Sequence, residues 1–347
     1  MARVLYGVMG NTYGHVARTQ AIVSQLPEHE FHFVGGGRVP ELLGKTYPVL
    51  EVPVKRTVHK RQRVSVTATM GHIAHCVASF PAVRREILHL IQRWQPEIAF
   101  CDREIFLPLA ARAADLECIS IDHSHVLRAC RSPVPPSQRL SWALSRIEDA
   151  LFFDFTRRNL IVSFFHPELK PGRRDELLPP VLRSEVRDVP PTQGDHVLIY
   201  QTSPTFVRLL EVARELSRPV IVYGFRDMRQ VEGNITFKPF HPRAILEDLA
   251  GCAYAVVNGG HNLICEALFY RKPVFCFPIS THFEQFVNAW HVRALGYGDF
   301  STSLAPTAEL FRHFEMRLHE YRENIVKKFN DGTSQVVERV RQLIGSR

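Results

Sequence analysis

The sequence predicts an α/β protein built from two similar domains, each with a parallel sheet and crossover helices. Three observations lead to this prediction. Strand-like and helix-like segments alternate along the chain, most strand-like segments are continuously apolar, and a proline- and charge-rich stretch at 169–195 interrupts the alternation. Such alternation is typical of parallel sheets, whose central strands are buried on both faces and lose their polar positions.

The same pattern defines the elements expected in each half. In the first half we expect strands at 2–10, 29–36, 96–102 and 117–123, and helices at 16–26, 86–94 and 106–116. In the second half we expect strands at 196–202, 218–225, 234–240, 253–260 and 272–279, and helices at 206–217, 244–252, 262–270 and 284–296.

These elements predict two Rossmann-like domains, 1–180 and 196–330, with a linker at 181–195 and a helix at 331–347 packed across the domain junction. The carboxyl ends of both sheets then face one cleft. Open parallel sheets bind their ligands at that edge, so we expect the chemistry to come from strand-end loops of both halves.

Composition and cysteine usage narrow the class of protein. With 45% hydrophobic and 22% charged residues, the 347-residue chain is neither disordered nor a disulfide-stapled miniprotein. No apolar run reaches the roughly 18 residues of a transmembrane helix, and 1–15 reaches glycines too early for a signal peptide. We therefore expect a cytoplasmic protein. Seven cysteines without a CxxC pair favour buried free thiols over disulfides or zinc.

The net charge of +8 favours acidic partners such as nucleotide phosphates, anionic lipid or nucleic acid. Part of the excess is local, because the stretch 55–63 carries five Lys and Arg residues and no acid. A run of this kind is typical of a solvated loop. No nucleic-acid-binding signature accompanies it, so a nucleic-acid partner is not favoured.

The first candidate site is the glycine-rich segment 7–15, between the first strand and the first helix. Glycines allow a tight turn and a close backbone approach to a ligand, and the helix N-terminus offers free N–H groups. The spacing is not GxGxxG, and 35–37 is Gly-Gly-Gly where a nicotinamide site has an acidic residue. His15 lies at the helix start, facing the cleft, either as a catalytic group or as a cap of the turn.

The second candidate site lies at two neighbouring strand ends, with Asp102 on one and Asp122, His123 and His125 on the other. Parallel neighbours place these groups on the same sheet edge as His15. A carboxylate that orients an imidazole makes a general base toward a hydroxyl. Ordinary charge pairing at a domain rim is the alternative, and no metal-ligand spacing supports a metal site.

The third candidate site, 256–289, is the most informative. A buried strand runs into Gly259-Gly260, where a helix N-terminus can receive a diphosphate. Glu266 follows one helical turn after Asn262 and can accept hydrogen bonds from ribose hydroxyls. Glu284-Gln285 follows the next strand and suits sugar hydroxyls. The alternative interpretation makes Glu266 a surface charge and Gln285 a helix cap.

Taken together, these motifs resemble a GT-B-fold glycosyltransferase of the UDP-glycosyltransferase and MurG-like (family 1/28) superfamily. The resemblance spans essentially the whole chain and is most specific in 238–296. Gly14, His15 and Arg18 match the G-x-G-x-G-H-x-x-R pattern of a poorly characterised prokaryotic subgroup.

The resemblance implies roles by position. His15 matches the general base and Asp102 the aspartate that orients it. The diphosphate turn would be Asn258-Gly259-Gly260-His261-Asn262, and Glu266 would be the carboxylate that binds the ribose. Glu284-Gln285 would be the pair that binds the donor sugar. The loop Thr202-Ser203 would face the phosphates, and the segment that meets the nucleobase would end at Phe240. Candidates on the acceptor side are Asn11, Arg18, Asp122, His123 and His125.

The activity so implied is inverting, metal-independent transfer of a sugar from a nucleotide sugar, with UDP as the implied nucleotide, to an acceptor hydroxyl. No cofactor and no metal are expected, and no metal-binding DxD motif is recognised. The helix dipole, hydrogen bonds and either Arg226 or Lys238 would balance the diphosphate charge. Asn258 and Leu263 replace the His and Ser of plant-type members, so some phosphate contacts must differ.

Three alternatives stay open on the sequence. A nucleotide-sugar 2-epimerase has the same architecture, and a non-catalytic sugar-nucleotide-binding protein would keep the fold. The acceptor is also undefined, because the basic and apolar segment 55–95 suits either a lid over a soluble acceptor or contact with anionic membrane and a lipid-linked acceptor. The second option would make the protein peripheral on the inner face of the membrane.

Overall fold

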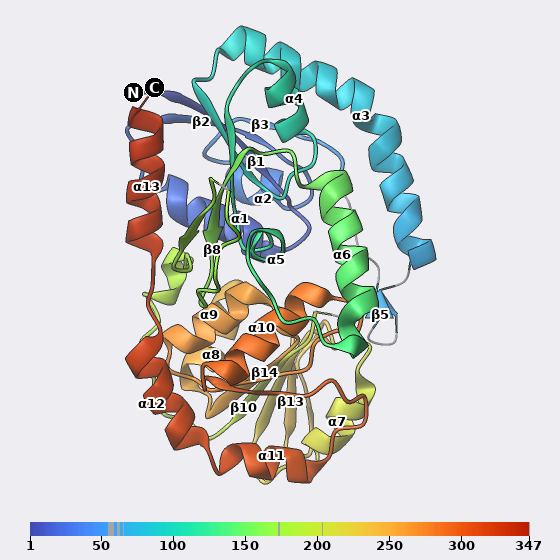
Figure 1. Cartoon of the computed structure of the whole chain (residues 1–347). Coiled ribbons are helices and arrows are strands. Elements are labelled where there is room, and N and C mark those ends of the chain that lie inside the picture. The colour runs from blue at the N-terminus through green and yellow to red at the C-terminus, as the bar shows by residue number, and fades with distance from the viewer. Residues whose placement is uncertain (55–58, 61–62, 65, 173, 203, 347) are drawn as a thin grey trace.

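The computed structural model describes residues 1–54, 59–60, 63–64, 66–172, 174–202 and 204–346. Each half of the chain forms a seven-stranded sheet. Figure 1 shows the two halves one above the other, with the last helix running back along the first half so that the two chain ends lie close together. The predicted α/β class with two parallel-dominated sheets is confirmed.

The first sheet has seven parallel strands in the order β3-β2-β1-β6-β7-β8-β9. These strands are β1 (Arg3–Val8), β2 (Glu30–Val34), β3 (Val49–Leu50), β6 (Ile98–Asp102), β7 (Cys118–Asp122), β8 (Arg158–Val162) and β9 (Glu176–Leu178). The helices of this half are α1 (Tyr13–Val23), α2 (Val39–Leu43), α3 (Val66–Trp94), α4 (Leu107–Ala113), α5 (Val126–Ala129) and α6 (Arg139–Phe152). A small hairpin of β4 (His59–Lys60) and β5 (Arg63–Val64) precedes α3.

The second sheet has the order β12-β13-β11-β10-β14-β15-β16. Among the described strands of this sheet, only β12 pairs with its neighbour in the antiparallel direction. Its strands are β10 (Val197–Tyr200), β11 (Val220–Tyr223), β12 (Gln230–Glu232), β13 (Ile235–Lys238), β14 (Tyr254–Val257), β15 (Val274–Cys276) and β16 (Gly298–Phe300). Its helices are α7 (Val207–Ala213), α8 (Pro242–Gly251), α9 (His261–Phe269), α10 (Phe283–Ala294), α11 (Ala308–Glu315) and α12 (Leu318–Lys328). The final helix is α13 (Thr333–Gly345).

Burial on both faces explains why the strands are continuously apolar. In β1, Val4 and Tyr6 join one core cluster, and Leu5 between them joins the cluster on the opposite face. Successive side chains of a strand point to opposite faces, so a central strand needs apolar residues at every position. All seven cysteines are free and buried, as expected.

Two segments differ from their sequence-based description. The helix expected at 86–94 is the last part of α3, which begins at Val66. The expected linker 181–195 is packed against the protein, with Val181, Leu182 and Val186 buried. It contains the 3-10 turn Ser184–Val186. Prolines and charges predict irregular backbone there, but they do not tell whether that backbone is exposed.

The helix α13 lies on the first half of the chain. Its Val336 and Val340 belong to the same core cluster as Val16 and Ile22 of α1. The hydroxyl of Thr333 also accepts a hydrogen bond from the backbone N–H of Leu182 at 3.0 Å. The chain thus crosses from the first half to the second and back again.

The two halves also share an apolar cluster. Phe164 and Phe165, which follow β8, belong to the same buried cluster as Ile264 of α9 and Phe283 of α10. The Phe165 ring stacks on His291 of α10 at 3.7 Å. The halves are therefore packed against one another at the strand-end edges of their sheets.

Candidate active site

The first sheet brings the predicted base and its partner together at the point where the strand order reverses. β1 lies between β2 and β6, and β6 continues the sheet in the other direction. Ligands of open parallel sheets bind beyond the carboxyl ends of the strands at such a point. Val8 pairs with Asp102 in the sheet register, and His15 lies in the first turn of α1. The sequence-based placement of His15 and Asp102 on one edge is reproduced.

His15 and Asp102 form a hydrogen-bonded pair. His15 Nδ1 lies 2.8 Å from Asp102 Oδ1, and the carboxylate is fully buried whereas 19% of the His15 side chain is exposed. When Nδ1 carries the hydrogen, it donates to Asp102, and the Nε2 lone pair is available to accept a proton. The pair has the contacts that a general base requires.

Arg18 completes this group and reaches the second half. Its side chain is buried and donates to Asp102 Oδ2 from Nε at 3.0 Å and from Nη2 at 2.7 Å. The third nitrogen, Nη1, lies 3.3 Å from Asn262 Oδ1 on α9. Burial alone would lower the pKa of Arg18, but the adjacent Asp102 carboxylate raises it overall, so the guanidinium stays charged.

The second sheet has its own reversal of strand order, between β10 and β14, and the predicted phosphate loops lie there. Asn258 Oδ1 accepts hydrogen bonds from the backbone N–H of Thr202 at 2.9 Å and from its hydroxyl at 3.1 Å. The Asn258 amide nitrogen donates to Gln201 Oε1 and to the carbonyl of Phe277. Asn258 therefore ties three strand ends together. Ser203 lies outside the described residues.

The turn before α9 has the backbone geometry expected of an anion site. Gly259 has a φ of +95°, and a Cβ there would lie 2.7 Å from the carbonyl oxygen of Gln285. The next residue, Gly260, is the N-cap of α9, and it provides no side-chain hydrogen bond to the first turn of this helix. The first N–H groups of a helix attract negative charge when no side chain satisfies them. The glycines that the sequence singled out are thus explained by a positive φ and an uncapped helix.

His261 occupies an unexpected place in this turn. Its ring stacks on His123 of the first half at 3.9 Å and is buried. Burial lowers the pKa of His261 well below its usual value, and the neighbouring His123 and Arg18 lower it further. His261 is therefore neutral, and it joins the halves as a ring rather than as a cation.

Glu266 already has a partner, which sequence reasoning missed. Arg183 donates to its two oxygens from Nε at 2.8 Å and Nη2 at 3.2 Å, and both side chains are buried. Burial raises the pKa of Glu266, and the adjacent Arg183 opposes that rise. The Arg183 guanidinium also lies 5.1 Å from the ring centre of Tyr13. Arg183 lies in the proline- and charge-rich stretch 169–195, where no sequence pattern distinguishes it from the other cations.

Glu284 and Gln285 have different hydrogen-bond partners. Gln285 Oε1 accepts the backbone N–H of Ile279 at 3.0 Å. Glu284 Oε2 accepts the Ser124 hydroxyl of the first half at 2.5 Å. Burial raises the pKa of Glu284, but His123 and other nearby cations outweigh it and hold this pKa below its usual value. Glu284 is thus ionised at the boundary between the halves.

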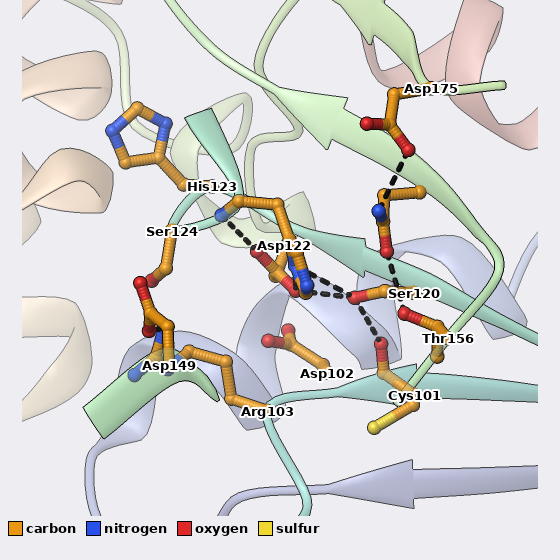
Figure 2. A network of polar contacts seen from close by, with 12 residues as sticks. Cys101, Asp102, Arg103, Ser120, Asp122, His123, Ser124, Asp149, Thr156 and Asp175 are labelled. Atoms are coloured by element: carbon orange, nitrogen blue, oxygen red, sulfur yellow. Dashed lines mark hydrogen bonds and ion pairs between the residues drawn. The ribbon is translucent and has the colours of Figure 1, made fainter. Parts of the chain in front are cut away.

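A second Asp–His pair lies at the end of β7 (Figure 2). Asp122 accepts from His125 Nδ1 at 2.6 Å and from the Ser120 hydroxyl. Burial lowers the pKa of His125, but Asp122 raises it overall. Both members of this pair are buried, whereas His15 is partly exposed, so the His15 pair is the more accessible base.

The remaining predicted residues lie around this centre. Phe240 is partly exposed, and its ring centre is 6.2 Å from that of Tyr13. Asn11 Nδ2 lies 3.6 Å from the Met9 sulfur. His123 Nε2 lies 2.7 Å from Asn288 Oδ1 across the boundary between the halves.

The two cations suggested to balance the diphosphate are engaged elsewhere. Lys238 pairs with Asp248 at 2.7 Å, and Arg226 pairs with Glu232 at 2.5 Å. In contrast, Arg18 and Arg183 both line the space between α1 and α9. Arg18 and Arg183 are also ion-paired, with Asp102 and Glu266, but they lie at this cavity and Lys238 and Arg226 do not line it.

The cavity between α1 and α9 is small. It is lined by Gly14, Arg18, Arg183, Asn262 and Glu266 among others, and it measures about 10 Å³. A water molecule needs roughly that volume, whereas pockets for small molecules measure several hundred Å³. A Cβ on Gly14 would overlap the side-chain amide of Asn262. A nucleotide does not fit into this cavity as it stands.

Two features of the described residues concern metal binding and membrane insertion. No group of three or more His, Cys, Asp or Glu side chains among them is arranged to hold a metal ion. Nor does any helix in that part of the chain combine the length and apolar character needed to cross a bilayer.

Comparisons with known proteins agree with this architecture. An uncharacterized glycosyltransferase of Methanosarcina acetivorans is 23% identical over 326 residues, covering 85% of this chain and 82% of that protein. MurG of Acinetobacter baumannii superposes with a TM-score of 0.61 at 13% identity, over 99% of this chain and 100% of that one. SsfS6, a Streptomyces sp. SF2575 glycosyltransferase complexed with thymidine diphosphate, superposes with a TM-score of 0.62 at 16% identity. This superposition covers 99% of this chain and 100% of that one.

The family model of glycosyl transferase family 1 matches residues 2–318. That match covers both sheets, the His15–Asp102 pair and the turn before α9. The resemblance to the UDP-glycosyltransferase and MurG-like group, and the GT-B fold that it implied, are confirmed. The chain belongs to glycosyl transferase family 1 and is a glycosyltransferase.

Proposed function

We propose that this glycosyltransferase moves a sugar from a nucleoside-diphosphate sugar to an acceptor hydroxyl, with inversion and without a metal ion. One observation carries the proposal: the accessible His15–Asp102 pair, at 2.8 Å, lies opposite the uncapped N-terminus of α9. Each group lies where the strand order of its sheet reverses. The contact of Arg18 with Asn262 joins the two.

The proposed step uses both halves. His15 Nε2 removes the proton of the acceptor hydroxyl, and the resulting oxygen attacks the anomeric carbon as the bond to the phosphate oxygen breaks. The nucleoside diphosphate leaves with the electron pair, and the sugar inverts because attack and departure occur on opposite faces. Asp102 stabilises the imidazolium that forms. The N–H groups of α9 and the cations Arg18 and Arg183 favour the leaving diphosphate.

The nucleotide specificity is the finer part of the proposal. A structural relative is complexed with thymidine diphosphate, and the superfamily resemblance implies UDP. UDP and thymidine diphosphate both have the diphosphate that the α9 N-terminus would accept. Both also have a hydroxyl on the nucleoside sugar that could donate to Glu266. We propose UDP-sugar as donor and use TDP-sugar as the comparison.

The test is an assay with UDP-sugars and TDP-sugars, with and without alcohol acceptors, in the presence of EDTA. We expect acceptor-dependent release of the nucleoside diphosphate, a product of inverted anomeric configuration by NMR, and a rate within about twofold of that without EDTA. Retained configuration would contradict inversion, and loss of activity in EDTA that Mg²⁺ restores would contradict metal independence. Epimer formation without acceptor would identify the 2-epimerase, and binding without turnover would identify a non-catalytic protein.

We also propose that the acceptor side contacts an anionic membrane surface, through α6. The apolar residues Leu140, Leu144, Ile147 and Leu151 recur at helical spacing on one face of this helix and are 72%, 44%, 56% and 60% exposed. The opposite face is fixed to the protein, because the buried Asp149 pairs with Arg103 at 3.5 Å. The apolar face of α6 is therefore held outward.

Charge and size favour lipid as the occupant of this face. Arg139 and Arg146 belong to α6, and the chain has a net charge of +8. Amphipathic helices of this kind lie in the membrane interface with cations near anionic headgroups. Four side chains are far fewer than the roughly 20 residues a side of a standard protein interface, so a stable dimer is less well supported. Arg103 directly follows Asp102, so docking by α6 would present a lipid-linked acceptor near the proposed base.

Vesicle co-sedimentation tests this surface. We expect binding to phosphatidylcholine vesicles that contain phosphatidylserine, and at least about tenfold weaker binding of the double variant Leu144→Ser/Ile147→Ser, since each buried aliphatic side chain contributes about 1.5–3 kcal/mol. The matched control is Val207→Ser/Val326→Ser, whose two residues are both 57% exposed on the second half. Equal binding by both double variants would contradict the proposal, as would a dimer that only the α6 variant dissociates.

A further inference from the structure

We infer that Arg18 is a positioning residue that holds Asp102 in the orientation in which it accepts from His15 and that couples this base to the donor half. The inference rests on the proposed function and extends it. Arg18 is 4% exposed and Asp102 is fully buried, so water contributes little to the charge balance between them. The Arg18 guanidinium spans both carboxylate oxygens, and Nη2 lies 2.8 Å from Oδ1 and 2.7 Å from Oδ2.

Arg18 holds the Asp102 carboxylate that fixes the tautomer of His15. Nη2 of Arg18 lies 3.1 Å from Nδ1 of His15, and that same ring nitrogen lies 2.8 Å from Asp102 Oδ1. A guanidinium is only a donor, and here its hydrogens have carboxylate oxygens to go to. Nδ1 therefore donates to Asp102, and the lone pair that can take a proton is left on Nε2.

Arg18 also supplies the counter-charge of Asp102. A buried carboxylate without a paired cation is costly, and Arg18 Nη2 lies 2.7 Å from Asp102 Oδ2. Other ionisable groups near this centre include Tyr6 of β1, Asp122 of β7, His123 and His261. Burial raises the pKa of Tyr6 and lowers that of His261, so both are neutral.

The third arm of Arg18 links the base to the donor site. Nη1 lies 3.3 Å from Asn262 Oδ1, in the first turn of α9. When the halves separate this contact is lost, and when they close on a donor it re-forms beside the turn proposed to hold the diphosphate. Lysine cannot reproduce these contacts, because a single ammonium does not span two carboxylate oxygens and an amide at once.

The test uses Arg18→Met, Arg18→Lys and the control Arg158→Met. Arg158 pairs with Glu176 in the same sheet, but it is the first residue of β8 and lies at the amino edge, away from the site. Histidine-selective ¹⁵N NMR needs no donor, and the His15 signal is assigned by its loss in His15→Gln. At neutral pH we expect the Nδ1–H tautomer in the unaltered protein and in Arg158→Met.

In Arg18→Met we expect the Nδ1–H tautomer to lose its excess over the Nε2–H tautomer, because the Asp102 carboxylate is no longer held against Nδ1. We also expect kcat to fall by about tenfold or more while the donor KM is nearly constant. In Arg18→Lys the charge remains but the grip on both carboxylate oxygens is lost, so kcat falls less than in Arg18→Met.

An unchanged ¹⁵N tautomer ratio and an unchanged kcat in Arg18→Met would overturn the inference, even if that variant were less stable. If Arg18→Met does not fold, an Arg18→Lys variant with unaltered kcat would overturn it. A protein that shows the change in the ¹⁵N tautomer ratio but transfers no sugar would contradict the proposed function and leave the role of Arg18 intact. The two failures are therefore distinguishable.

Discussion

Replacing His15 with alanine should lower turnover by a factor of about 10²–10⁴, which is the range that a positioned general base contributes. Nucleotide binding should be largely retained, because the proposed diphosphate and ribose contacts come from the second half, Arg18 and Arg183, and His15 is not among them. The two readouts are kcat with the best sugar donor and the dissociation constants of UDP and TDP by calorimetry. The expected pattern is a large loss in kcat with a small change in affinity.

The control for this variant is His125→Asn. His125 is also paired with an aspartate, at 2.6 Å from Asp122, but it is buried. If the accessible pair is the base, a folded His125→Asn protein keeps far more turnover than His15→Ala. Near-normal turnover in His15→Ala would reject the assignment, and a larger loss in His125→Asn than in His15→Ala would transfer it to the second pair.

Glu266→Ala should lower the free energy of unfolding by about 3–5 kcal/mol, because it leaves Arg183 buried without its partner. That is a large part of the roughly 5–15 kcal/mol that stabilises a typical domain, so the loss is readily measured by urea unfolding. Glu266→Gln keeps the shape of the side chain and removes its charge. It should weaken UDP binding about 10- to 100-fold, since a hydrogen bond to a charged group contributes about 1.5–3 kcal/mol.

The double variant Arg183→Met/Glu266→Met separates stability from binding. Two apolar side chains of similar volume often replace a buried ion pair at no cost in stability, so we expect the stability to recover. UDP affinity should not recover, because no carboxylate is left for the ribose. A double variant that binds UDP normally would show that Glu266 is a structural group and not a donor ligand.

The strand ends show how much of the site the sequence predicts. His15, Asp102, Asn258 and Glu266 could be assigned because parallel strands place their carboxyl ends on one edge, and the apolar runs reveal where each strand ends. Glycines at 259 and 260 marked a turn for the same local reason. These inferences need only short-range patterns and one rule about sheet edges.

Side-chain partners across the fold were not predictable in the same way. Arg183 comes from a segment whose prolines indicated only a linker, yet it binds Glu266, 83 residues away. Arg18 was placed on the acceptor side, yet it binds Asp102 and Asn262. Each contact depends on how two sheets and a packed linker are oriented, and no local pattern records that orientation.

The sequence by itself therefore determined the class of fold, the strand ends and the types of group available there, because periodicity, burial and glycine turns are local properties of a chain. Only the tertiary structure decided that Arg18 and Arg183 lie together at a cavity of about 10 Å³ between α1 and α9, and that α6 turns its apolar face outward. These outcomes depend on long-range packing, in which distant side chains compete for the same partners and the same volume.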